Sequence, residues 1–269
     1  MGKRKATDGG RLLELSSDYS EDELDAIAEL YDRARLRMRR SPADRDERTR
    51  RAVADAALRA LVARRAMVLE GGPSRPRVRL LEPHASVLEP FVHPEAIVAI
   101  RAFRPDSSTV LRVLFVREDA VVVQEALPGH AICRMTLHPR KRVLDHLLAG
   151  VPDPSEDAVQ DRAPLELTVR MLERTERAIA NGAPTPDGVP DVAVDVLYAR
   201  VISLAFEITR LDEDGAIVVE RRAWMAAGNL GAWELVDGDG DPPATVTLTP
   251  RGGDDLREWL TDVATTLAP

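Results

Sequence analysis

Residues 134–139 read RMTLHP, and residues 245–250 read TVTLTP. In each stretch a Thr-Leu pair is followed by one further residue and a proline. A charged segment with helical periodicity comes next, RKRVLDHLL in the first case and RGGDDLREWL in the second. A proline cannot donate a hydrogen bond to a neighbouring strand, so each one predicts the end of a strand. The apolar positions that follow predict an amphipathic helix, so the chain contains two candidate copies of one strand–proline–helix unit.

The segments that precede each unit have the composition of strands. They lie at 96–103, 110–116, 120–127 and 130–137 in the first half, and at 203–211, 216–224, 229–236 and 244–250 in the second. Short connections such as Asp214-Gly215 predict antiparallel hairpins. The expected fold is therefore α+β, a central antiparallel β-sheet flanked by helical bundles. Its two pseudo-symmetric halves would come from an internal duplication of about 110 residues. The competing interpretation is that strand–proline–helix is a common local pattern.

Three helical segments stand out beside the strands. Ser20 and Glu23 have capping-box spacing ahead of an apolar stripe, which predicts a helix start. An arginine-rich helix is expected at 44–65, and a further helix from Pro164 to Asn181-Gly182. The expected organisation is one compact unit with a disordered tail at 1–18, an N-terminal half at 19–151, a connection and helix at 152–190, and a C-terminal half at 191–269.

Composition limits the classes of function. The 269 residues carry a formal net charge of −8, which makes nucleic acid an unlikely general partner. Apolar runs stay well short of the roughly 18 residues of a membrane span, and the basic N-terminus is not followed by the apolar segment of a secretory signal. Cys133 is the single cysteine in the sequence, so an internal disulfide is excluded. We expect a cytoplasmic protein that does not act at a membrane. Its arginine- and alanine-rich composition fits an actinobacterial, GC-rich genome.

The sequence shows no recognisable catalytic or cofactor motif. The five histidines lack metal-site spacing, and His138 and His146, eight residues apart, are expected to have a surface role. Cys133 is expected to be a buried or edge thiol, because His130 should point to the opposite face of its strand. The acidic segment 237–241 lacks the glycine and glutamate of a calcium loop. We therefore expect a non-enzyme with no cofactor, metal or small-molecule substrate. An enzyme whose site the sequence does not reveal is the remaining alternative.

Residues 44–80 suggest a different class of function. An arginine-rich helix followed by a Gly/Pro turn and a short strand resembles the recognition helix and wing of a winged-helix protein, whose arginines contact DNA phosphates. This interpretation makes the chain a transcriptional regulator. The alternative to DNA binding is an ordinary solvent-exposed helix face. It is supported by the acids that lie among the arginines, at Asp44, Asp46, Glu47 and Asp55.

The order of elements resembles that of EspG-like proteins, cytosolic chaperones of type VII (ESX) secretion. The segment ALRALVARRAMV, the strand pair from AIVAIRAF onward and the strand–proline–helix unit ending at VLDHLLAGVP are similar to the first half of that family. Residues 204–267 resemble its C-terminal half. The chain departs from the family at Arg65-Ala66-Met67-Val68, where Arg-Gly-Leu-Val is common, and at the segment around Trp224.

The resemblance implies a non-catalytic chaperone that binds and masks the apolar tip of a helical secretion-substrate heterodimer. Its implied partner-binding residues are Arg104, Asp106, Ser107 and Ser108 in one inter-strand loop, and Trp224, Met225 and Asn229 beside a glycine-rich turn. Tryptophan and methionine are common anchors at protein interfaces. The alternative for Trp224 and for Trp233 is packing in the core of the sheet.

Overall fold

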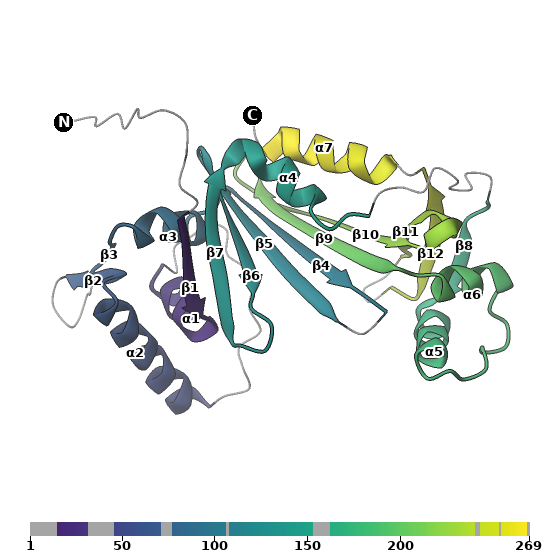
Figure 1. The fold of residues 1–269 in the computed structure, drawn as a ribbon, viewed down its shortest axis with the longest axis horizontal. Coiled ribbons are helices and arrows are strands. Elements are labelled where there is room, and N and C mark those ends of the chain that lie inside the picture. Colours follow the sequence, from purple (N-terminus) through teal and green to yellow (C-terminus); the bar gives the residue numbers. More distant parts are fainter. Residues whose placement is uncertain are drawn as a thin grey trace.

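The computed structural model describes residues 15–31, 46–70, 77–105, 108–152, 162–212, 214–239, 243–252 and 254–267. Within these ranges ten strands form one antiparallel sheet, shown in Figure 1. The first five are β1 (Leu15–Ser20), β4 (Ala96–Phe103), β5 (Thr109–Arg117), β6 (Ala120–Ala126) and β7 (Ile132–Pro139). The second five are β8 (Leu165–Thr168), β9 (Ile202–Leu211), β10 (Ile217–Ala226), β11 (Ala232–Asp237) and β12 (Thr245–Arg251). The predicted α+β class with a large antiparallel sheet is confirmed.

The strand order has the same form when it is followed from the centre to either edge. The order is β1-β7-β6-β5-β4-β9-β10-β11-β12-β8, so β4 and β9 pair at the centre. Each half begins with the strand that becomes its edge, continues through helices, and then returns as a four-stranded meander. The first Thr-Leu-x-Pro stretch ends β7 at Pro139, and the second lies at the end of β12, one residue before its last.

The helices of the described residues lie on both faces of this sheet (Figure 1). They are α1 (Glu21–Leu30), α2 (Glu47–Ala63), α3 (His84–Val92), α4 (Val143–Leu148), α5 (Val169–Ala180), α6 (Asp191–Tyr198) and α7 (Asp255–Leu267). The 3₁₀ turns are η1 (Arg140–Arg142) and η2 (Gly228–Leu230), and β2 (Met67–Glu70) pairs with β3 (Arg77–Leu80) in a separate hairpin. Within the described ranges, every helix is too short or too polar to cross a membrane.

Three apolar clusters explain why the helices pack where they do. Helices α4 and α7 cover the centre of one sheet face, where Leu147 and Leu260 join the strands in one buried cluster. The opposite face is covered only toward its two ends in the described structure. There α1–α3 pack over β5–β7 around Phe115, and α5 and α6 pack over β10–β12 around Trp233. The middle of that second face is left without a helix, and it is called here the open face.

Two sequence predictions fail at edge strands. Residues 15–18, expected to belong to a disordered tail, form the start of β1, where Tyr19 is buried and pairs with Cys133. The helix expected from Pro164 instead begins at Val169, after the four-residue strand β8. Alternation explains the second difference, because Leu167 is buried against β12 while its neighbours are exposed or half-buried. Thr168 then caps α5 by accepting from the Met171 amide at 3.1 Å.

A polar network ties β1 to the three helices beside it. The capping box is confirmed: Ser20 Oγ accepts from the Glu23 amide at 3.1 Å, and Glu23 Oε2 accepts from the Ser20 amide at 2.8 Å. The buried Glu23 also pairs with Arg64, the residue that ends α2, at 3.1 Å. Tyr19 hydroxyl contacts His84 Nδ1 of α3 at 2.7 Å. Burial raises the pKa of Tyr19 to about 12 and lowers the pKa of His84, so both groups are neutral at pH 7 in this hydrogen bond.

Tyr19→Phe should lower the free energy of unfolding by about 1 kcal/mol, because it removes one buried hydrogen bond and keeps the ring. Urea denaturation at pH 7 measures the loss. Tyr198→Phe is the matched control, since Tyr198 is 72% exposed and should leave stability unchanged. Equal stability of the two variants would contradict the proposed role of this hydrogen bond.

Candidate protein-binding groove

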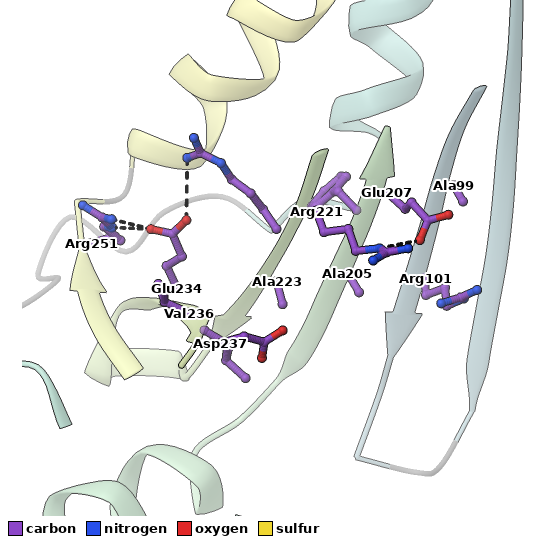
Figure 2. Close-up of a pocket in the computed structure, with 13 residues that line it drawn as sticks. Ala99, Arg101, Ala205, Glu207, Arg221, Ala223, Glu234, Val236, Asp237 and Arg251 are labelled. Carbon is purple, nitrogen blue, oxygen red and sulfur yellow. Dashed lines mark hydrogen bonds and ion pairs between the residues drawn. The ribbon is translucent and has the colours of Figure 1, made fainter. Parts of the chain in front are cut away.

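A hollow of about 620 Å³ lies across the central strands β4, β9, β10 and β11 (Figure 2). Its floor on the open face is made of alanines. Ala223 lies opposite Ala205 across β10 and β9, and Ala205 lies opposite Arg101 of β4. Ala99 is two residues from Arg101 and therefore points to the same face. Because the side chains at these positions are small, the surface is low at the middle of the sheet. The helices that cover the two ends of this face stand higher on either side.

Charged side chains border this floor. Arg221 Nε donates to Glu207 Oε2 at 2.8 Å, and this pair lies across β10 and β9. Arg101 and Asp237 are exposed on the strands at either side of the groove and form no ion pair within the described ranges. The groove therefore offers one available cation and one available anion, separated by the alanine floor.

A buried carboxylate lies behind the hollow, on the face that α7 covers, because Glu234 pairs with Trp224 across β11 and β10. The side chain of Glu234 is 8% exposed, accepts from Arg251 Nε at 2.8 Å, and lies 3.6 Å from the Arg222 guanidinium (Figure 2). Arg222 in turn lies over the Trp259 ring at 4.9 Å, which connects this cluster to α7. Because two arginines satisfy a single buried charge, this cluster fixes β10, β11 and β12 against one another.

Exposed apolar side chains lie beyond the groove, at one end of the central strands. Phe103 lies opposite Ser203, and Ala226 lies opposite Ile202, so the loops after β4, before β9 and after β10 all emerge at that end. Three residues are defined here as the apolar rim: Phe103, Tyr198 and Val201, which are 40%, 72% and 54% exposed. The sequence analysis did not single them out, since an apolar residue at a strand or helix end carries no signal of exposure.

The open face also carries exposed apolar side chains at the opposite end of the central strands. Ile217 and Val219 begin β10 and are 58% and 46% exposed. Their odd-numbered positions place them on the same face as Ala223. The open face is thus a polar-bordered alanine floor between two exposed apolar ends.

The structure separates the partner-binding residues predicted from sequence. Arg104 is exposed, and its amide donates to the Ser108 carbonyl at 3.1 Å across the β4–β5 turn. Asn229 is exposed in η2, at the same end of the sheet. These three residues therefore border the apolar rim. Asp106 and Ser107 lie outside the described residues.

Trp224 and Met225 occupy the interior instead of the surface. They are 3% and 2% exposed, and as strand neighbours they point to opposite faces of β10. Trp224 joins the cluster under α7, while Met225 joins Trp233 in the cluster under α6. Since the sheet is covered on both faces at this point, the core-packing alternative holds for both tryptophans.

The expected surface role of two histidines is wrong. His138 is buried, and its ring lies 4.3 Å from the ring of His146, because α4 folds back over β7. Cys133 is a buried free thiol, as expected, on the opposite face of β7. In the described part of the chain, no three metal-ligating side chains gather into a group that could hold an ion.

Neither the protein-family models nor the curated proteins compared with this chain match it.

Glu234→Ala should lower the free energy of unfolding by about 2 kcal/mol, because it removes the charge-assisted hydrogen bonds of a carboxylate that is 8% exposed. Glu207→Ala is the matched comparison and should cost at most about 1 kcal/mol, since Arg221 in that pair is 73% exposed. Thermal and urea unfolding of both variants measure the difference. Equal losses would show that Glu234 does not hold β10, β11 and β12 together.

Proposed function

We propose that the chain is a non-catalytic, cytoplasmic chaperone of the EspG-like type, which binds the apolar tip of a helical secretion-substrate heterodimer. The observation that carries this proposal is the open face: an alanine floor at the centre of the sheet, with the apolar rim at one end and Ile217 and Val219 at the other. Exposed apolar side chains of this kind commonly mark surfaces that another protein covers.

The small side chains of the groove floor leave room for the end of a helical hairpin to approach the sheet. An α-helix with its side chains is about 10 Å across, and it approaches a sheet most closely where the sheet presents alanine. Phe103, Tyr198 and Val201 would then supply the apolar anchors around the tip, because large side chains at a desolvated centre contribute most of the binding energy. The sheet itself would keep its shape on binding.

Charges at the border support recognition of one orientation of the partner. Arg101 favours an acidic side chain or the C-terminal end of a helix, whereas Asp237 favours a basic side chain or a helix N-terminus. Such complementary charges mainly increase the association rate and exclude wrong partners. The Glu207–Arg221 pair between them would stay formed, since each charge already has its partner.

The shape of the groove also fits an origin by internal duplication, which we propose for this fold. The strand order repeats outward from the β4–β9 pair, and each half ends in a helix that covers the same face of the sheet. Two copies joined through their first meander strands would place their remaining helices far apart on the opposite face. The open face would then be a consequence of the doubling.

Binding should depend on the alanine floor and on the apolar rim. We expect Ala205→Trp and Phe103→Asp each to weaken capture of the helical partner at least tenfold, because one fills the groove and the other places a charge in an apolar contact. Co-expression with candidate helical heterodimers encoded beside the gene, followed by affinity purification and titration calorimetry, measures this.

Leu69→Asp is the matched control for this experiment, since Leu69 is also exposed but lies on the β2–β3 hairpin. It should leave capture unchanged. If no helical partner co-purifies with the wild-type chain, the chaperone proposal fails. If the partner binds and the groove variants bind equally well, the groove is not the site.

A second candidate function is DNA binding through residues 44–80, and one observation favours it. Helix α2 is followed by the β2–β3 hairpin, and Arg48 and Arg59 are exposed on the helix. Asp55 is also exposed between them, which weakens the positive potential of that surface. A salt-dependent gel shift with promoter DNA that Arg48→Glu abolishes would support this function. Absence of any gel shift at about 50 mM salt would exclude it.

A further inference from the structure

The contact between His138 and His146 brings together two titratable groups that the groove does not use. His138 lies near the end of β7, with its side chain toward the face that α4 and α7 cover, and His146 lies on α4. Their ring centroids are 4.3 Å apart, and the rings are tilted by 50°. Nε2 of His146 is enclosed and has no hydrogen-bond partner among the described residues. Each imidazole therefore forms part of the surface that buries the other.

The charged groups around the pair are mainly positive. Arg112 of β5 donates to the carbonyls of Ala149 at 3.1 Å and of His146 at 3.5 Å, and it pairs with Glu125 of β6 at 2.7 Å. Arg142 of η1 pairs with Asp145, the acid on α4, at 3.1 Å. Helix α7 contributes apolar side chains to the cluster beneath α4. Both acids are thus already engaged by arginines.

A proton on His146 is disfavoured in the folded chain. Burial lowers the pKa of His146 to about 4, and the charges of His138, Arg142 and Arg112 lower it further, against a smaller opposite effect of Asp145. A histidine in an unfolded chain has a pKa of about 6.5. The unfolded or opened state therefore binds more protons, so stability is present above pH 6.5 and is lost as pH falls toward 4.

Helix α4 is the element that this loss would affect. It has only six residues, and within the described structure it is held by Val143 and Leu147 in the core, by Arg112 at its end, and by the histidine contact. A helix of this length does not persist without its tertiary contacts. We infer that the His138–His146 contact is a pH-sensitive latch: it holds α4 on the sheet while His146 is neutral, and protonation of His146 releases α4 while the central strands stay folded.

Hydrogen exchange of the full chain tests this latch. Exchange is followed at pH 7 and pH 5 with correction for the intrinsic rates, in the presence of EDTA. The opening equilibrium of residues 143–148 should increase about twentyfold in the wild type for a group whose pKa moves from 6.5 to 4. In His146→Phe, which keeps an aromatic ring without a titrating nitrogen, that increase should disappear.

Two further variants make the outcome decisive. His138→Phe should reduce the same pH dependence, because it removes the charge of His138 but leaves His146 buried, and this reduction is the test if His146→Phe does not fold. His130→Gln, at an exposed turn, should behave as the wild type. The latch is excluded if both phenylalanine variants keep the wild-type pH dependence. It is also excluded if β4 and β9 lose protection together with α4, because the change would then be global unfolding.

Discussion

The pairing of β4 with β9 is the constraint on which the rest of the structure depends. Eight residue pairs, from Ala96 with Arg210 to Phe103 with Ser203, join the first meander to the second. Because each meander then runs outward from this pair, the edge strands and their helices are carried to opposite ends of the sheet. The same pairing sets Ala205 beside Arg101 and brings the loop after β4 to the start of β9. The groove, the apolar rim and the two-sided arrangement of helices all follow from one central ladder.

The two faces of the sheet differ in how helices cover the β4–β9 pair. On the covered face, α4 and α7 meet over the centre, and Leu147 and Leu260 belong to one continuous cluster with the strands. Arg140 of η1 strengthens this layer by donating to the Leu267 carbonyl at the end of α7, so the two halves are also tied through their closing helices. On the open face the helices stay at the flanks. A rigid, well-packed layer thus supports a surface that remains available, which is the arrangement that binding without large rearrangement requires.

Much of the fold could be predicted from local sequence. The β-branched run at 96–103 matches β4 residue for residue, and the Ser20–Glu23 capping box starts α1 as expected. The edge strands β1 and β8 were not predicted, because they are short and partly polar. They are extended because they pair with β7 and β12. The candidate site could be predicted only in part. Arg104, Ser108 and Asn229 lie at the apolar rim, but the alanines of the groove floor carry no sequence signal at all.

The sequence by itself determined the strands of the two meanders and the start of α1, because these depend on β-branching, proline and capping side chains within a few residues of each other. Tertiary structure alone decided which faces are covered. Trp224 and Met225 adjoin in sequence, yet each is buried by a helix from a different part of the chain. His138 and His146 lie eight residues apart and meet only because α4 folds back on β7. A side chain is buried by the elements that pack on it. In this protein the order of the strands around β4 and β9 determines which elements those are.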